Sequence, residues 1–226
     1  MVYYQKQQIM NELINNKSKT IKETIENLPY FSISDLMPIE KNKNYLKVLF
    51  YRLSKQGKIR TLKRGMYVGE KFFGNIEKKN AISEYSEFVG NVIYKPSYLS
   101  LEYMLEKYGV LSESVNSFTL VSKKKTKKFS NHLGIFKYYN IREKLFVGFE
   151  IAKKSSFWIA EATLPKALFD FLYFRKNILF SEKQIDELRL NLDSFTKKNF
   201  RELKKYIKLE NSKRMKEIFE YIIKKV

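Results

Sequence analysis

The feature that most constrains this chain is a row of apolar residues in its first third. They recur at i, i+3, i+4 and i+7, which places them on one face of an α-helix running from about Asn44 to Gln56. Gly57 follows directly and suits the positive φ at which many helices end. A helix with one apolar face has to bury it, so a core must form around this segment. The four residues of the stripe are Leu46, Leu49, Phe50 and Leu53.

Short elements flank this helix on both sides. Ser32 or Ser34 is expected to cap a short helix before it. After it, Lys58–Leu62 and Met66–Val68 read as two strands joined by a tight turn, with a glycine supplying the positive φ. Helix, turn, longer helix and hairpin is the order of a winged helix-turn-helix, and we predict that fold for Phe31–Val68.

The face opposite the apolar stripe is basic and carries an amide. Recognition helices turn such side chains toward the major groove, and the hairpin tip of a winged helix lies over a phosphate or in the minor groove. The alternative is a solvated basic hairpin on a core module. The predicted DNA contacts are Lys43, Asn44, Lys47, Tyr51, Arg52 and Lys55 on the helix and Lys63 and Arg64 at the tip.

The charge balance of the whole chain favours the same partner. There are 44 Lys and Arg against 24 Asp and Glu, a net charge of +20. Such an excess attracts polyanions, and nucleic acid is the leading class, with an anionic membrane as competitor and a general lysine bias as the simplest alternative. No apolar run approaches the roughly 18 residues of a membrane span, and no signal peptide is recognisable, so we expect a cytoplasmic protein without a membrane partner.

The residue types present argue against an enzyme. The chain has no cysteine and one histidine, His132, so thiolate chemistry and most zinc sites are excluded, and we expect no metal and no cofactor. His132 is expected in a turn that enters a strand. A nuclease reading of Asp193, Glu202 and Lys204 is formally open, but that pattern works on strands and this stretch reads as helix. No catalytic residue is predicted.

Two domains are expected, residues 1–75 and 80–226, with a linker between Gly69 and Asn80 where the apolar periodicity stops. The first 75 residues carry a net charge of +8 and the remainder +12, so the basic character is not confined to the predicted DNA-binding part. The first domain is expected to begin with helices over Tyr3–Asn15 and Thr20–Leu28.

The second domain is expected to combine a small sheet with helices, making the chain α+β overall. Ser97 or Ser100 is expected to cap a helix that Gly109 ends, and Ser181 with Gln184 forms a capping-box pattern. The predicted strands are Phe118–Ser122, Ile135–Tyr139 and Leu145–Glu150. The predicted helices are Ala81–Val89, Ser100–Tyr108, Leu164–Phe174, Ser181–Leu190, Lys197–Lys208 and Ser212–Lys224.

A run of lysines follows the first of these strands. Its members are Lys123, Lys124, Lys125, Lys127 and Lys128. The run is read either as a second phosphate contact or as a patch for an acidic protein surface, and a plain solvated hairpin connection is the alternative. The sequence leaves these open.

Several segments, in order, resemble the AbiEi antitoxin family. They are Tyr98–Leu111, Phe118–Phe129, Leu133–Ile141, Leu145–Glu150 and Ile159–Tyr173. The chain departs from the family at Pro165, where a glutamate is more usual.

The resemblance implies a winged helix followed by a C-terminal antitoxin domain. It further implies a transcriptional regulator of a viral defence system that represses its own promoter on double-stranded DNA and counteracts a nucleotidyltransferase toxin, often without forming a stable complex. An alternative is a protein-binding module that directly inhibits a partner enzyme, with DNA binding secondary.

Overall fold

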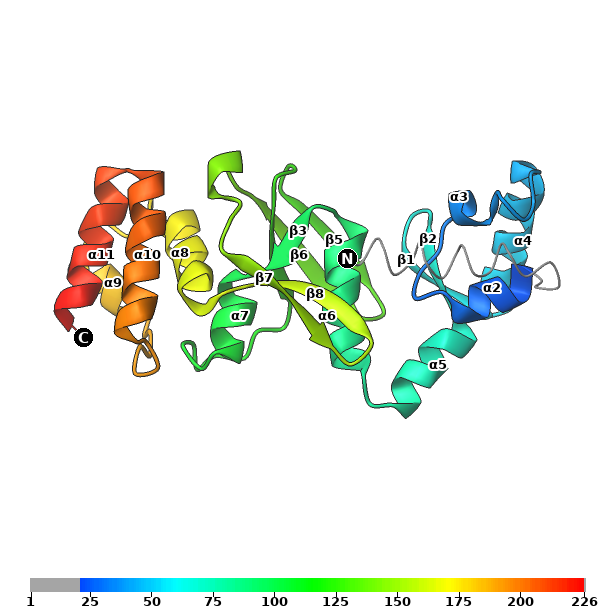
Figure 1. The fold of residues 1–226 in the computed structure, drawn as a ribbon, viewed down its shortest axis with the longest axis horizontal. Helices are drawn as coiled ribbons and strands as arrows, with labels where there is room; N and C mark the ends of the chain where they lie inside the picture. Colours follow the sequence, from blue (N-terminus) through cyan, green and yellow to red (C-terminus); the bar gives the residue numbers. More distant parts are fainter. Residues whose placement is uncertain (1–20, 226) are drawn as a thin grey trace. The chain divides into compact units, whose positions relative to one another are not determined.

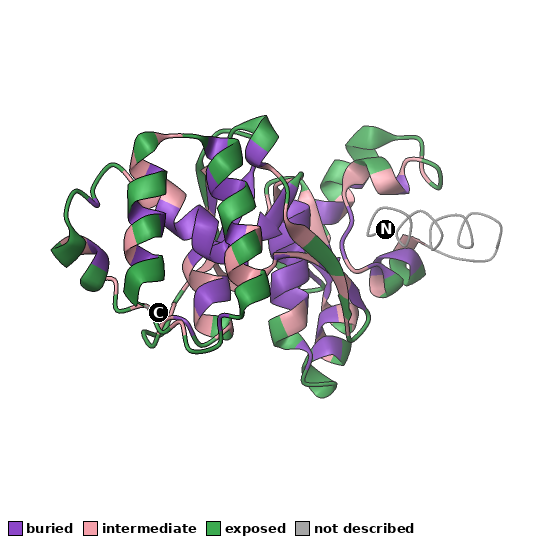
Figure 2. Cartoon of the chain, turned by 60° about the vertical axis from the view of Figure 1, so that its left-hand side comes forward, coloured by how far each residue is buried: buried purple, intermediate pink, exposed green. Residues whose placement is uncertain are grey.

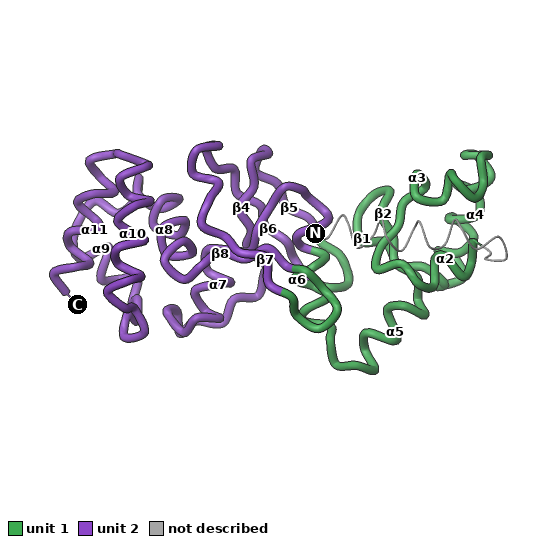
Figure 3. The backbone as a smooth tube through the Cα atoms, in the orientation of Figure 1, with its two compact units in different colours: residues 1–89, 130–133, 153–158 green, residues 90–129, 134–152, 159–226 purple. Residues whose placement is uncertain are grey.

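A computed structural model describes residues 21–225, and the helix predicted over Tyr3–Asn15 lies outside them. The described chain is α+β, with a two-stranded and a six-stranded sheet (Figure 1). The described residues form two compact units: residues 21–89, 130–133 and 153–158 make unit 1, and residues 90–129, 134–152 and 159–225 make unit 2 (Figure 3).

Unit 1 contains Phe31–Val68, the stretch for which a winged helix-turn-helix is predicted. Its elements are α2 (Ile21–Asn27), α3 (Ile33–Leu36), α4 (Lys43–Lys55), β1 (Ile59–Lys63), β2 (Met66–Gly69), α5 (Glu70–Lys78) and most of α6 (Ile82–Ile93). Strands β1 and β2 pair antiparallel, so the predicted hairpin is confirmed.

The predicted apolar face of α4 is confirmed as the centre of a core. Leu46 and Phe50 are buried, and Leu49 and Leu53 pack against the same cluster from its edge. The ring of Phe50 meets Phe31 edge-on at 5.4 Å between centroids, a geometry that aromatic quadrupoles favour. The core therefore joins α2, α3, α4 and β1 in one cluster.

Local signals in the sequence set the ends of these elements. Ser32 caps α3, and its backbone N–H donates to the Asp35 carboxylate at 2.8 Å. At the end of α4, Gly57 has φ +66°, and the Lys58 N–H donates to the Leu53 carbonyl at 2.8 Å, as in a Schellman motif. The predicted C-terminal glycine is therefore confirmed.

The predicted linker between Gly69 and Asn80 is wrong, because α5 occupies it. Phe73 and Ile76 lie one turn apart and are buried, which provides the apolar face that the glycine and asparagine between them obscured in the sequence. Unit 1 runs on through α5 to residue 89. The domain boundary predicted between residues 75 and 80 stays a prediction.

Unit 2 holds most of the six-stranded sheet, whose order is β5-β6-β4-β3-β8-β7. Strand β4 pairs antiparallel with β3 and parallel with β6, and β3 pairs parallel with β8, so the sheet is mixed. The strands are β3 (Ser97–Leu99), β4 (Phe118–Ser122), β5 (Lys127–Asn131), β6 (Gly134–Asn140), β7 (Phe149–Lys154) and β8 (Phe157–Ala162).

The C-terminal helices of the chain pack together at one end of unit 2 (Figure 1). Helix α8 contacts both α7 and α10, and α11 packs against α10. The outward faces of α10 and α11 are exposed and their inward faces buried, whereas α8 carries no exposed residue (Figure 2). The elements are α7 (Leu101–Lys107), a 3-10 turn η1 (Glu143–Leu145), α8 (Leu164–Arg175), α9 (Glu182–Asp186), α10 (Lys197–Glu210) and α11 (Lys213–Lys225).

Most of the predicted elements of unit 2 are confirmed, and two are corrected. The strand predicted over Leu145–Glu150 is wrong in its first half: Leu145 ends η1, Gly148 has φ +76°, and β7 begins at Phe149. Helix α9 has the predicted capping box at Ser181 but ends at Asp186 instead of Leu190. Strands β3, β5 and β8 were not expected.

Among the described residues, no helix combines the length and the apolar character that crossing a membrane requires.

Candidate functional site

The exposed face of α4 carries every helix residue that the sequence analysis selected for DNA contact. All of them are exposed: Lys43, Asn44, Lys47, Tyr51, Arg52 and Lys55. Large apolar and aromatic side chains lie among them, with 51% of Tyr45, 49% of Val48 and 64% of Tyr51 exposed. The face thus mixes cations, an amide and aromatic surface, which suits both phosphate contact and contact with base edges.

Caps fix the orientation of this face. The side chain of Asn42 accepts hydrogen bonds from the backbone N–H groups of Asn44 and Tyr45 at 3.1 and 3.0 Å. Farther along, the Lys55 ammonium lies 5.8 Å from the centre of the Tyr51 ring. The basic face is therefore carried on a capped helix whose opposite side packs in the core.

The two hairpin residues selected from the sequence differ in position. Arg64 lies in the turn and is exposed, next to Gly65 with φ +79°. Lys63 is the last residue of β1 and is half-buried. The hairpin is also tied to the chain before α3, because Phe31 and Tyr67 exchange two backbone hydrogen bonds of 2.8 Å.

The side chain of Arg60, in β1, is held by contacts within unit 1. Its guanidinium pairs with the Glu70 carboxylate and stacks 4.0 Å above the Phe73 ring. The hydrogen bond between them raises the pKa of Arg60 and lowers that of Glu70. This arginine holds α5 against the hairpin, so it is not counted among the candidate DNA contacts.

The lysine run spans the connection from β4 to β5 and the first two residues of β5 in unit 2, and the backbone of the connection is held in place. The Asn140 amide donates to the carbonyls of Lys123 and Lys124 at 3.0 and 2.9 Å, and the Tyr94 hydroxyl donates to the Lys125 carbonyl at 3.0 Å. A loop fixed in this way loses little further entropy when it binds. We call Lys123, Lys124, Lys125, Lys127 and Lys128 the lysine loop; all five side chains are exposed.

Aromatic rings lie beneath part of the lysine loop. The ammonium groups of Lys124 and Lys127 lie 5.4 and 5.9 Å from the centre of the Tyr94 ring. Lys123 is neutralised instead, since it pairs with Glu143 at 2.7 Å, and this hydrogen bond lowers the pKa of Glu143. The remaining lysines of the loop present a positive surface.

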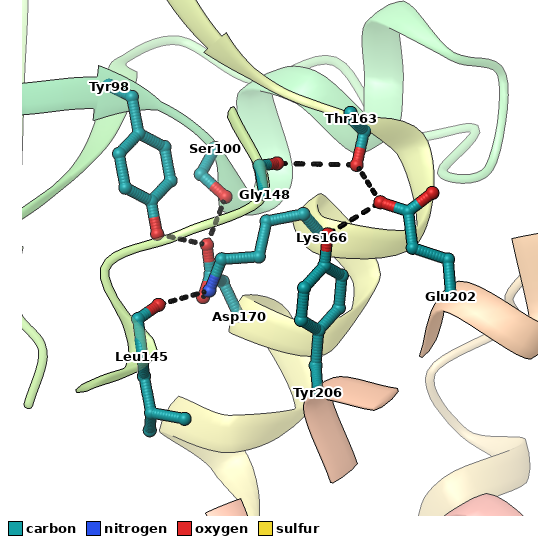
Figure 4. A network of polar contacts seen from close by, with 9 residues as sticks. All are labelled: Tyr98, Ser100, Leu145, Gly148, Thr163, Lys166, Asp170, Glu202 and Tyr206. Atoms are coloured by element: carbon teal, nitrogen blue, oxygen red, sulfur yellow. Dashed lines mark hydrogen bonds and ion pairs between the residues drawn. The ribbon is translucent and has the colours of Figure 1, made fainter. Parts of the chain in front are cut away.

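A buried polar network in unit 2 was missed by the sequence analysis (Figure 4). Lys166 and Asp170, one turn apart on α8, are fully buried and form an ion pair of 2.6 Å. Burial raises the pKa of Asp170 and lowers that of Lys166, and each charge opposes the shift of the other. Asp170 also accepts hydrogen bonds from the hydroxyls of Ser100 and Tyr98 at 2.8 and 3.0 Å.

The network continues to neighbouring segments. Lys166 donates to the Leu145 carbonyl at 2.9 Å. Beside it, Glu202 of α10 accepts hydrogen bonds from Thr163 at 3.0 Å and Tyr206 at 2.5 Å. The same Tyr206 fills the space next to Gly148, where an added Cβ would lie 2.2 Å from its hydroxyl oxygen. This network fixes β3, η1 and α10 on α8.

The signal for this network was in the sequence but was ambiguous. Lys166 and Asp170 are the two charged residues in the stretch from Leu164 to Tyr173, and they are spaced i, i+4. The same spacing is common for pairs on exposed helix faces. Only the burial of the whole helix distinguishes the two cases.

The residues considered for catalysis, Asp193, Glu202 and Lys204, do not belong to a metal-binding cluster among the described residues. Within residues 21–225, no three His, Asp or Glu side chains gather in a way that would hold a metal ion. Glu202 is used by Thr163 and Tyr206, as described above, on the predicted helix. His132 lies in the turn from β5 to β6, as predicted, with its ring 5.1 Å from that of Phe73.

In comparisons with known proteins, no family model and no curated protein matched this chain.

Proposed function

We propose that residues 31–68 act as a winged helix-turn-helix that binds double-stranded DNA, and that the chain is a transcriptional repressor of its own promoter. The observation that carries the proposal is the face of α4: six polar or basic candidates are exposed on a helix whose other side is buried in the core. Such a helix can enter the major groove without losing its packing.

The hairpin adds a second point of contact. Arg64 is exposed at the β1–β2 turn, and the paired strands hold it at a fixed place relative to α3 through the Phe31–Tyr67 pairing. Phosphate contacts of this kind fix the register of a protein on DNA, while the helix reads the bases.

We further propose that the chain is the antitoxin of a type IV toxin-antitoxin pair and counteracts a nucleotidyltransferase. The support is the ordered resemblance of Tyr98–Tyr173 to the AbiEi family. A nucleotidyltransferase gene beside this one would support the pairing, and rescue of cells from that toxin by the full chain would test it.

DNA binding is tested by changing Lys47 and Arg52 to alanine. Affinity for promoter DNA should fall, and the slope of log affinity against log salt should flatten by about 0.9 for each phosphate that the variant no longer neutralises. A matched control changes the exposed Lys78 and Lys79 on and beside α5 to alanine, which removes the same charge from the same unit.

Unchanged promoter binding by the Lys47 and Arg52 variant would refute the assignment of α4. Equal loss of affinity in both variants would show that net charge, and not this helix face, determines binding. In cells, the α4 variant should lose repression but keep rescue from the toxin, which separates the two parts of the proposal.

A further inference from the structure

Helices α10 and α11 enclose a groove that the proposed DNA binding does not use. Its volume is about 440 Å³. Its floor is apolar and consists of Ile207, Phe219 and Ile223. Its rim is formed by Lys204, Lys208, Lys216, Glu220 and Lys224.

One of the apolar lining residues, Ile223, is exposed to solvent. The apolar stripe of α11 is otherwise buried, with Met215, Ile218 and Ile222 each at most 4% exposed, whereas Ile223 is 44% exposed. The flanking Ile207 and Phe219 are almost covered. A partner that filled the groove would remove the Ile223 side chain from water and gain the corresponding hydrophobic free energy.

The rim carries several lysines that form no ion pair with an acidic side chain among the described residues. On α11, Lys213 and Arg214 pair with Glu217, and Lys225 pairs with Asp186. Lys216 and Lys224, the two lysines of this helix that line the groove, take part in no ion pair within residues 21–225.

The part of the rim that α10 provides also carries exposed lysines. Lys204 and Lys208 are one turn apart, exposed, and also without an ion pair in the described part of the chain. Glu220 is the single acid of the lining, so the groove has a net charge of +3. A ligand therefore has to be apolar in its centre and acidic along both edges.

Three ligand classes meet a basic surface of this kind, and the floor distinguishes them. A nucleic acid backbone satisfies the lysines but offers no apolar ridge for Ile223. A membrane needs a broad exposed apolar face, whereas here only Ile223 of the three apolar lining residues is substantially exposed. An amphipathic helix with acidic flanks fits both the floor and the rim. We infer that the groove between α10 and α11 docks an acidic amphipathic helix of a partner protein.

The test uses the full chain and a labelled synthetic peptide of about sixteen residues, with leucines at i, i+3, i+4 and i+7 and glutamates on both flanks. Fluorescence anisotropy should give a Kd below about 100 µM, an ordinary strength for a single helix in a groove. A peptide of the same composition with the leucines scrambled should bind at least tenfold more weakly. No binding, or equal binding of the two peptides, would overturn the inference.

Matched variants locate the site. Lys208→Glu with Lys224→Glu should weaken binding at least tenfold. Lys197→Glu with Lys198→Glu, at the start of α10 and outside the groove lining, makes the same change in net charge and should leave it nearly unchanged. An equal loss of affinity in both would show that only total charge attracts the peptide and would refute the groove.

Occupancy can also be read directly, because the chain has no cysteine. Ile223→Cys places a single thiol in the groove, and the acidic helix should slow its alkylation by at least fivefold. If saturating peptide did not slow the alkylation, this result would count against docking. So would a Lys208 and Lys224 variant that no longer bound phosphatidylserine vesicles but still bound the peptide. The α4 variant with Lys47 and Arg52 changed should bind the peptide normally, so this inference and DNA binding can fail separately.

Discussion

At the scale of single residues, the buried ion pair of Lys166 and Asp170 should be costly to break by replacing one partner alone. Taking two charges out of water is expensive, and it is tolerated here because each has several partners. Asp170 accepts from Lys166, Ser100 and Tyr98, and the Lys166 ammonium also lies 4.6 Å from the centre of the Phe169 ring. The pair links the end of β3 and η1 to α8.

Lys166→Met should therefore lower the free energy of unfolding by about 3–5 kcal/mol, because it leaves the Asp170 carboxylate buried without a countercharge. Adding Asp170→Asn removes that charge but keeps an acceptor for Tyr98 and Ser100, and should recover at least half of the loss. Urea unfolding followed by circular dichroism measures both. If Lys166→Met alone lowered the free energy of unfolding by less than about 1 kcal/mol, the pair would not be buried as described.

At the scale of elements, an ion pair ties the end of α8 to the end of α10. Lys176, the C-terminal cap of α8, donates to Glu210 at 2.5 Å, and the Ser212 N–H donates to the same carboxylate at 2.7 Å. Burial by itself would raise the pKa of Glu210, but these hydrogen bonds outweigh it and the pKa is lowered. A carboxylate with a lowered pKa stabilises the fold when it is ionised.

The sign of the pH effect follows. The contribution of Glu210 is fully present above its unfolded pKa of about 4.5 and is lost as the pH falls through the lower pKa of the folded state. Glu210→Gln should cost about 1.5–3 kcal/mol at pH 7. The difference from the unchanged chain should shrink as the pH falls below about 4.5 and on through the lowered pKa of the folded state. Denaturant titrations at several pH values measure it; a difference that stays constant with pH would contradict the role of the charge.

At the scale of the whole molecule, the net charge of +20 is spread over several basic surfaces, and variants can separate them. Lys124→Ala with Lys127→Ala in the lysine loop should weaken binding to duplexes of any sequence about equally, with a salt slope smaller by about 0.9 for each phosphate left unneutralised. Preference for the promoter should persist. Lys183→Ala with Lys213→Ala, which are also exposed and lie in the same unit, is the control. Unchanged DNA affinity in the loop variant would favour the acidic protein surface as its partner.

Much of the fold was predictable because its signals are local. The stripe of α4, the glycines that end α4 and form the hairpin turn, and the cap at Ser181 depend on residues within about four positions of one another. The exposed candidates on α4 followed from the same periodicity. Where a local signal was weak, as in α5 between Gly69 and Asn80, the prediction failed although the helix is short and regular.

What the sequence determined by itself is therefore the set of amphipathic helices, their ends, and the basic character of the face that α4 leaves exposed. Only the tertiary structure decided that β3 pairs with β8 far along the chain, that the whole of α8 is buried together with Lys166 and Asp170, and that Ile223 is left uncovered between lysines. The physical reason is that periodicity reflects neighbours along the chain, whereas burial and strand pairing depend on segments that meet only when the chain folds.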